Sequence, residues 1–213
     1  MKGFIFDLDG VLIHTDKLHY QAWKKLADSI DVYFDEKINE QLRGVSRTDS
    51  LEIILKNSKQ TFSSVEKELL ANEKNETYRE LLKTLTPEDV APEVRKALEQ
   101  LKLLGYKLAV GSSSKNAKYI MDYTDLTKYF DAISDGNNIT KSKPDPEVFI
   151  KAAEYLSLAC EECYVVEDAF AGISAAKAGN FKAIGIGSAT EDPDCDFKIH
   201  NLLDLISIVE RNL

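Results

Sequence analysis

The stretch Lys2-Gly3-Phe4-Ile5-Phe6-Asp7-Leu8-Asp9-Gly10-Val11-Leu12 sets the start of the fold. Its apolar run Phe4–Phe6 ends abruptly at a charge, which is typical of a short strand buried inside a sheet. Asp7 and Asp9 follow this strand directly. Because ligands of open parallel sheets bind beyond the carboxyl ends of the strands, the two carboxylates are candidate site residues.

Downstream of this strand, residues 15–85 carry helical patterns only. An apolar residue recurs every four positions from Leu18 to Ile30, with Thr15 as a candidate N-cap. Asp35 can cap a second, short helix, and Leu51 and Ile54 mark a third. Ser63-Ser64-Val65-Glu66 has the spacing of a capping box and predicts the start of a fourth helix.

After residue 86, strands and helices alternate. Strands are expected at 106–111, 129–133, 164–167 and 182–187, and helices at 92–104, 115–124, 146–156, 169–178 and 202–209. Such alternation predicts a parallel sheet with helices on both faces. We therefore expect an α/β fold with a doubly wound, Rossmann-like core at 1–14 and 86–213. An all-helical cap domain would be inserted at 15–85, with hinges near 13–15 and 85–89.

Polar residues follow several of the expected strands, so they would gather at one edge of one sheet. They are Asp7, Asp9, Ser112 to Ser114, Lys143, Glu167 and Asp168. Carboxylates crowded together repel each other unless a cation neutralises them. Oxygen ligands suit Mg²⁺, and a hydroxyl and a lysine suit a phosphate. The set indicates phosphoryl transfer, in which an aspartate can act as the nucleophile.

The same residues resemble the four motifs of the haloacid dehalogenase superfamily. Asp7-Leu8-Asp9-Gly10 is similar to the first motif, Ser112 to the second, Lys143-Pro144 to the third and Glu167-Asp168 to the fourth, in the same order. The resemblance implies that Asp7 is the nucleophile and Asp9 the general acid/base. It also implies Mg²⁺ held by Asp7, Asp168, Glu167 and the Asp9 carbonyl, with Ser112 and Lys143 on the transferring phosphate.

Within that superfamily, the chain resembles the β-phosphoglucomutases along essentially its whole length. The resemblance rests on residues 19–23, on Arg43-Gly44-Val45-Ser46-Arg47, and on Ser112 to Asn116. It implies a second phosphate site and cap residues that face the substrate: Arg47, Ser114, Lys115 and Asn116 for the phosphate, and His19, Arg43, Gly44, Val45, Ser46 and Lys74 for the substrate. Arg43 replaces a lysine and His14 an aspartate found in many relatives.

The leading hypothesis is therefore interconversion of β-glucose 1-phosphate and glucose 6-phosphate through an aspartyl-phosphate and a bisphosphate intermediate. A sugar-phosphate phosphatase is the alternative, and the second phosphate site would distinguish the two. Asp9 and the acidic fourth motif argue against dehalogenation, and no cap lysine can be assigned to the Schiff base of a phosphonate hydrolase. Intact motifs argue against a binding module without activity.

The amino-acid composition limits the kinds of molecule that the protein can bind. The chain has 213 residues, 44% of them hydrophobic, and a net charge of −9. So acidic a protein binds nucleic acid poorly, and no apolar run approaches the roughly 18 residues of a membrane span. We expect a cytoplasmic monomer that acts on small sugar phosphates. Cys160, Cys163 and Cys195 are expected to remain thiols, and the spacing of the first two is interpreted as structural, since no further ligands complete a zinc site.

Overall fold

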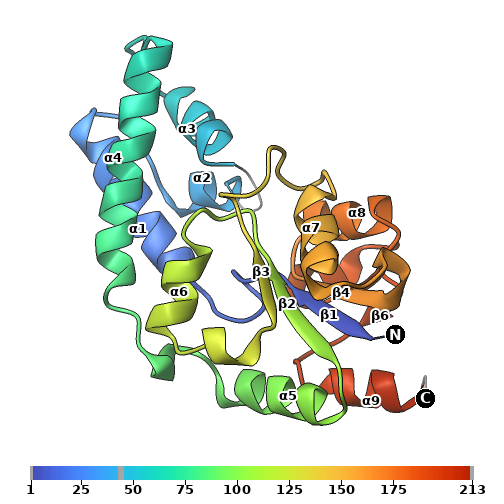
Figure 1. Cartoon of the computed structure of the whole chain (residues 1–213). Coiled ribbons are helices and arrows are strands. Elements are labelled where there is room, and N and C mark those ends of the chain that lie inside the picture. The colour runs from blue at the N-terminus through green and yellow to red at the C-terminus, as the bar shows by residue number, and fades with distance from the viewer. Residues whose placement is uncertain (1, 43–45, 212–213) are drawn as a thin grey trace. The chain divides into compact units, whose positions relative to one another are not determined.

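The computed structural model describes residues 2–42 and 46–211 (Figure 1). The chain divides into two compact units. One, here named the core unit, comprises Met1–His14 and Thr86–Leu213, and the other, the helical unit, comprises Thr15–Leu85. None of the described helices is both long and apolar enough to cross a membrane.

The core unit contains one parallel sheet, as the sequence predicted. Its strands are β1 (Gly3–Phe6), β2 (Lys107–Gly111), β3 (Ala132–Ser134), β4 (Cys163–Glu167), β5 (Lys182–Gly185) and β6 (Phe197–Lys198). Their order across the sheet is β3-β2-β1-β4-β5-β6, and every neighbouring pair is parallel. The strand that opens the chain therefore lies inside the sheet, and its Phe4, Ile5 and Phe6 are fully buried.

The strand register aligns the carboxyl ends of three strands. Phe6 of β1 lies opposite Val110 of β2 on one side and Val166 of β4 on the other. Asp7, the next residue, donates its amide to the Val166 carbonyl at 3.0 Å. Residues that follow β1, β2 and β4 consequently emerge at the same edge of the sheet.

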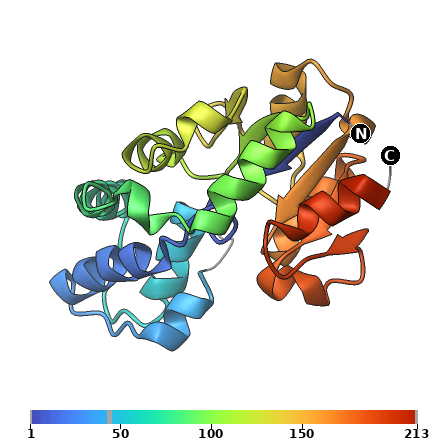
Figure 2. The same cartoon turned by 90° about the horizontal axis from the view of Figure 1, so that it is seen from below.

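Helices cover both faces of this sheet. They are α5 (Pro92–Leu103), α6 (Ala117–Tyr123), α7 (Glu147–Leu156), α8 (Phe170–Ala178) and α9 (Asp204–Arg211). α7 and α8 pack on the strands from one side, and α5 and α9 pack together on the other (Figure 2). Pro92 occupies the first turn of α5, and Gly105 ends this helix with a φ of 84°, as expected from the sequence.

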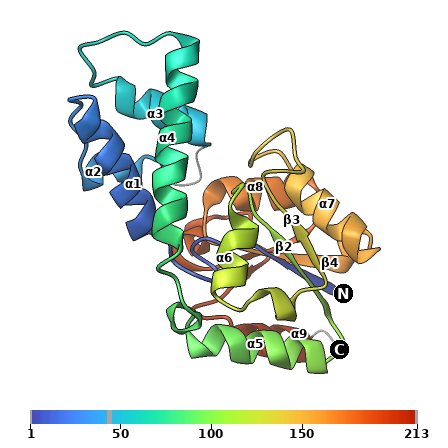
Figure 3. The same ribbon diagram turned by 60° about the vertical axis from the view of Figure 1, so that its left-hand side comes forward.

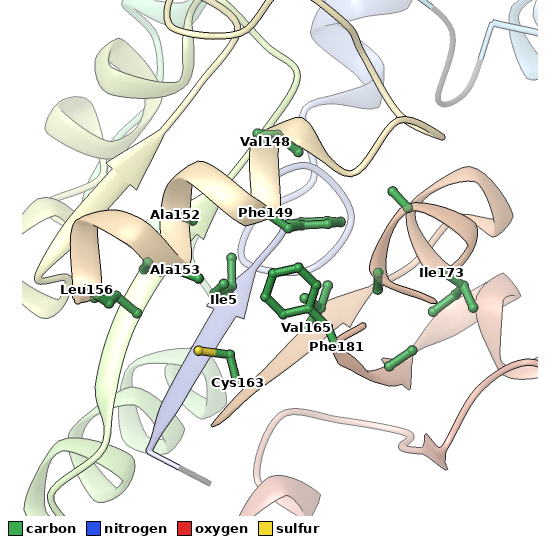
Figure 4. Packing of buried hydrophobic residues seen from close by; sticks show 14 of the residues in the cluster. Ile5, Val148, Phe149, Ala152, Ala153, Leu156, Cys163, Val165, Ile173 and Phe181 are labelled. Atoms are coloured by element: carbon green, nitrogen blue, oxygen red, sulfur yellow. The ribbon is translucent and has the colours of Figure 1, made fainter. Parts of the chain in front are cut away.

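A large buried cluster lies between α7, α8 and the sheet (Figure 4). The rings of Phe149 and Phe181 meet edge to face at 6.2 Å. Cys163 is buried among these side chains, and burial raises the pKa of its thiol to about 12. A buried thiol that is so hard to ionise is a poor nucleophile.

Two expected strands have different bounds in the structure. The strand expected at 129–133 begins only at Ala132, because Thr127–Tyr129 form a 3-10 turn (η2) closed by hydrogen bonds to Leu126 and Thr127. The strand expected at 182–187 ends at Gly185, since Gly187 has a φ of 58° and starts another 3-10 turn, η4 (Gly187–Glu191). Short 3-10 turns also occur at η1 (Pro87–Asp89) and η3 (Cys160–Glu162).

The helical unit consists of α1 (Asp16–Ser29), α2 (Glu36–Glu40), α3 (Arg47–Leu55) and α4 (Ser64–Leu82) (Figure 3). Asp35 caps α2 through the Ile38 amide, and Ser63 and Glu66 form the predicted capping box of α4. Thr15 precedes α1, but its hydroxyl lies 3.0 Å from the Tyr78 hydroxyl instead of capping the helix. Trp23 lies in the apolar core of this unit.

Candidate active site

Lys143 joins two carboxylates at the carboxyl edge of the sheet. Its Nζ donates a hydrogen bond to Asp7 Oδ1 at 2.5 Å and another to Glu167 Oε1. The side chains of Lys143 and Glu167 are 9% and 1% exposed, so these charges are largely removed from water. Pairing within the site is what allows such buried charges to persist.

Lys143 and Glu167 both have pKa values above their ordinary ones. Burial by itself would lower the pKa of Lys143, but the charges of Asp7 and Glu167 outweigh this and raise it above its ordinary value. Burial raises the pKa of Glu167, and Lys143 offsets only part of that effect. Lys143 is therefore a permanent cation near pH 7, suited to a phosphate group.

Glu167 is held by backbone amides as well as by Lys143. Its Oε2 accepts hydrogen bonds from the amides of Asp168 at 3.0 Å and Ala169 at 3.2 Å, just before α8. Gly172 makes this possible, since a Cβ at that position would lie 1.9 Å from the Glu167 carboxyl carbon. A glycine in the first turn of α8 thus leaves room for the buried carboxylate.

Asp7, Glu167 and Asp168 form a cluster of oxygen donors. One carboxylate oxygen from each lies within 4.8 Å of the other two. Gly10, with a φ of 91°, approaches the cluster so closely that a Cβ there would lie 2.1 Å from Asp168 Oδ2. An oxygen-only donor set of this size fits a hard divalent cation such as Mg²⁺.

Asp9 lies in the tight turn that follows β1. The turn is closed by hydrogen bonds from the Gly10 amide to the Ile13 carbonyl at 2.7 Å and from the Leu12 amide to the Leu8 carbonyl at 3.0 Å. Asp9 is partly exposed, whereas Asp7 is buried. Two aspartates only two positions apart therefore occupy different environments.

The predicted phosphate residues follow β2. Ser112 is buried and its hydroxyl accepts a hydrogen bond from the Ser114 amide at 3.2 Å, while Ser114 Oγ accepts one from the Asn116 amide. Asn116 is buried at the start of α6, and Lys115 is exposed. These contacts hold 112–116 as a compact turn whose Ser112 amide also bonds the Ser134 carbonyl of β3.

The helical unit has its own cluster of basic residues. Lys74 Nζ lies 3.0 Å from His19 Nδ1 and 4.6 Å from the ring centres of Trp23 and Tyr78. Burial, then the charges of Lys74 and Arg47, lower the pKa of His19 well below its usual value. His19 is consequently neutral near pH 7, and its Nδ1 accepts the hydrogen bond from Lys74.

Lys74, which the sequence alone would leave as a solvated surface residue, is only 3% exposed. Burial lowers the pKa of Arg47, and Glu76 offsets part of that shift. Arg47 is the first residue of α3, and Ser46 is the N-cap of this helix. The Ser46 hydroxyl accepts a hydrogen bond from the Asp49 amide. The remaining predicted substrate residues, Arg43, Gly44 and Val45, lie outside the described residues.

Glu147 is not among the site residues predicted from the sequence, yet its carboxylate binds the loop that carries Lys143. Its Oε2 accepts hydrogen bonds from Thr140 and Lys141. An acidic residue directly after Pro146 is an ordinary helix-start pattern, so nothing in the local sequence distinguishes it. Only the folded chain brings Thr140 and Lys141 to this carboxylate.

Comparison with known proteins agrees with the fold. The model of the haloacid dehalogenase-like hydrolases matches residues 1–180. The chain belongs to this family, and it is a phosphoryl-transfer enzyme.

Its similarity to individual relatives is more specific. It is 40% identical to the β-phosphoglucomutase of Bacillus subtilis over 96% of this chain and 92% of that protein. A phosphorylated carbohydrates phosphatase of Thermotoga maritima is 32% identical, over 86% of this chain and 84% of the phosphatase. The crystal structure of β-phosphoglucomutase from Clostridium difficile superposes with a TM-score of 0.90 and 34% identity, covering 99% of this chain and 96% of that one.

Proposed function

We propose that the chain is a β-phosphoglucomutase, which interconverts β-glucose 1-phosphate and glucose 6-phosphate. The core unit would be its catalytic domain and the helical unit its cap. The observation that carries the proposal is Lys143, which bonds Asp7 and Glu167 at the carboxyl edge of the sheet. A nucleophilic carboxylate beside a buried cation is what transfer of an anionic phosphoryl group requires. The similarity to two β-phosphoglucomutases supports glucose phosphate as the substrate.

The proposed reaction has two half-reactions. An Asp7 carboxylate oxygen bonds to phosphorus as the bond from phosphorus to the sugar oxygen breaks, and Asp9 gives that oxygen a proton. In the other half, Asp9 removes the proton from a sugar hydroxyl, which then takes the phosphoryl group from Asp7. Glucose 1,6-bisphosphate links the two halves. Lys143 and Ser112 would hold the phosphoryl oxygens throughout.

Asp7, Glu167 and Asp168 would hold Mg²⁺, since their oxygens form a set that fits this ion. When bound, Mg²⁺ would neutralise negative charge on the carboxylates and on the phosphoryl oxygens. The Asp9 carbonyl is a further ligand in this proposal. The remaining work falls to the protein's own side chains, with Lys143 providing fixed positive charge.

A mutase must also hold the phosphate that is not transferred. Arg47 is the proposed cap ligand, because its planar fork matches two phosphate oxygens. Ser114, Lys115 and Asn116 are the proposed phosphate ligands of the core unit. His19 and Lys74, joined at 3.0 Å, and residues 43–46 would face the sugar.

The second candidate is a sugar-phosphate phosphatase, in which water replaces the second sugar hydroxyl. It is favoured by the phosphatase of Thermotoga maritima, which is 32% identical over most of both chains. Asp7, Asp9 and Lys143 would act in the same way in either enzyme. The two candidates differ in the acceptor of the phosphoryl group and in the need for Arg47.

One assay separates them. The protein is supplied with β-glucose 1-phosphate, Mg²⁺ and a trace of glucose 1,6-bisphosphate, and both glucose 6-phosphate and free phosphate are followed. The proposal predicts glucose 6-phosphate as the main product. Release of phosphate in equal or greater amount would favour the phosphatase, and turnover to neither product would refute both.

A further inference from the structure

The loop between β3 and α7 carries Lys143, and α7 holds this loop at two points. Glu147 Oε2 accepts three hydrogen bonds of 2.8 Å, from the Thr140 amide, the Thr140 hydroxyl and the Lys141 amide. Lys151 Nζ donates to the Asn138 carbonyl. The segment that leads to Lys143 is therefore bonded to side chains that are one helical turn apart.

Glu147 and Lys151, together called the clamp here, also contact each other. Lys151 Nζ lies 3.2 Å from Glu147 Oε1, in the i,i+4 arrangement of a helix. The helix beneath them is firmly anchored, since Val148 and Phe149 are fully buried. Phe149 itself lies under Lys143, with its ring centre 4.7 Å from Nζ. One end of α7 thus contacts both the loop backbone and the Lys143 side chain.

The clamp depends on a negative charge. Hydrogen bonds from Lys141 and Thr140 lower the pKa of Glu147 to about 2. Glu147 is thus a carboxylate at any pH at which the enzyme would work. The carboxylate accepts the three hydrogen bonds at Oε2 and faces the Lys151 ammonium with Oε1. A glutamine has a single acceptor oxygen, so turning that oxygen toward the loop sets its NH₂ group against the Lys151 ammonium.

We propose that Glu147 is a positioning residue for phosphoryl transfer, acting through the loop that carries Lys143. The inference rests on the proposed role of Lys143 as a ligand of the transferring phosphate. Thr140 and Lys141 are exposed, so water would compete for their amides without this carboxylate. Lys143 follows only two residues later, and a lysine is long and has many rotamers. Fixing its backbone keeps Nζ between Asp7 and Glu167.

An ordinary surface ion pair would not have this effect. Exposed ion pairs such as Lys83 with Glu80 contribute little to the stability of the fold, because water screens the charges and the side chains lose conformational entropy. Glu147 differs because it binds backbone amides of a loop that leads into the site. Misplacing a catalytic group by about 1 Å can lower a rate about a hundredfold. Loss of the Glu147 carboxylate should therefore reduce the catalytic rate more than the stability of the fold.

The test compares Glu147→Gln with Glu154→Gln, a matched control on the same helix. Glu154 is exposed, and the described part of the chain shows no side-chain hydrogen bond for it. Glu147→Asp keeps the charge and tests for rescue. Three readouts are used: kcat and KM with a small acyl phosphate and Mg²⁺, hydrogen exchange of the Thr140 and Lys141 amides, and the ¹⁵N-edited NMR signal of the Lys143 ammonium.

In Glu147→Gln, kcat/KM should fall about tenfold or more, mainly through kcat, with Glu147→Asp intermediate. The Thr140 and Lys141 amides should exchange about tenfold faster, and the Lys143 signal should shift or broaden. Glu154→Gln should match wild type in every readout. The proposal is overturned if kcat/KM stays within about twofold of wild type, or if protection is lost across β1 and β4 as well.

Failure of the proposed function gives a different result. If the wild-type protein turns over neither β-glucose 1-phosphate nor the acyl phosphate, the assignment of Asp7 and Lys143 is wrong. The exchange and NMR readouts need no turnover, so they still decide whether Glu147 positions Lys143. An unchanged Lys143 signal in Glu147→Gln would reject the inference in that case too.

Discussion

The Lys143 ammonium contacts Asp7 and Glu167, which lie 136 and 24 residues away in the sequence. Each carboxylate therefore depends on a buried cation, and the cation on both carboxylates. Removing one partner of such a pair leaves an uncompensated buried charge. Variants at this site should accordingly be chosen to keep the shape of the side chain.

Asp7→Asn is such a variant, because the amide is nearly isosteric with the carboxylate. An amide cannot form the acyl phosphate, so turnover should fall below about a hundredth of wild type while the fold persists. Turnover of β-glucose 1-phosphate and circular dichroism check the two statements. Asp125→Asn, which removes an exposed partner of Lys128, serves as the control and should remain active. Higher residual activity in Asp7→Asn would exclude Asp7 as the nucleophile.

Arg47→Ala tests the second phosphate site. It removes the guanidinium fork but leaves Asp7, Asp9 and Lys143 in place. Mutase turnover should fall at least about a hundredfold, or about 3 kcal/mol, the scale of a lost charge-assisted contact. Hydrolysis of a small acyl phosphate, which has no second phosphate, should remain near the wild-type rate.

The control is Arg79→Ala on α4, which removes a guanidinium that pairs with Glu76 at 3.6 Å. It should leave both rates near wild type. A parallel fall of both rates in Arg47→Ala would mean that Arg47 is structural. If neither rate fell, the second phosphate would bind elsewhere, and the phosphatase would become the better assignment.

Among the helices, α4 has the most complete start signal. Ser63 Oγ accepts a hydrogen bond from the Glu66 amide at 3.3 Å, and Glu66 Oε2 accepts one from the Ser63 amide at 2.7 Å. Ser63→Ala removes half of this box and should destabilise the helical unit by about 1 kcal/mol. Denaturant unfolding followed by tryptophan fluorescence measures this, because the chain's single tryptophan is Trp23 in that unit.

Ser64→Ala is the matched control, since Ser64 is exposed and already lies within the helix. Alanine has a higher helix propensity than serine, so this variant should be as stable as wild type or slightly more so. Equal destabilisation by both substitutions would show that the capping box does not contribute.

The start of α7 predicts a pH dependence. The pKa of Glu147 is about 2 in the folded chain, below its ordinary value of 4.5. A depressed pKa stabilises the fold fully above the unfolded value, and the contribution disappears as the pH falls toward the folded value. Wild type should therefore exceed Glu147→Gln in stability by a constant amount above about pH 5, and the difference should shrink toward pH 2.

Unfolding at a series of pH values measures this difference. Glu154→Gln, which removes an exposed carboxylate of the same helix, should show no comparable trend. A difference that stayed constant down to about pH 2 would mean that the charge of Glu147 does not stabilise the fold.

The complete sheet brings together carboxylates from the two chain segments of the core unit. Asp7 follows β1, Glu167 ends β4 and Asp168 follows it, yet their oxygens lie within 4.8 Å of one another. Excess chelator should abolish turnover, because the cluster repels an anionic substrate unless a cation is bound. Adding Mg²⁺ back should restore it. The assay is repeated with both reagents on one preparation, and full activity in chelator would refute the metal assignment.

Much of the fold was predictable because its signals are local. The apolar run of β1, the Pro92 and Gly105 limits of α5, and the Ser63–Glu66 box each act through neighbouring residues. The edge of the sheet where polar residues gather was also predictable, since parallel strands align their carboxyl ends. The same rule predicts from the sequence alone that Asp7, Lys143, Glu167 and Asp168 lie at this edge.

Tertiary structure decided the rest, because the remaining interactions join residues that no local pattern connects. β6 has only two residues and depends on pairing with β5. Tyr129 lies in a 3-10 turn, although the sequence favoured a strand from this residue on. In the sequence, Glu147 has the pattern of any acidic residue at a helix start. Its hydrogen bonds to Thr140 and Lys141 form only in the folded chain. Burial of Lys74 and the bridging of two carboxylates by Lys143 likewise arise only when distant segments meet, since packing against those segments sets both burial and charge pairing.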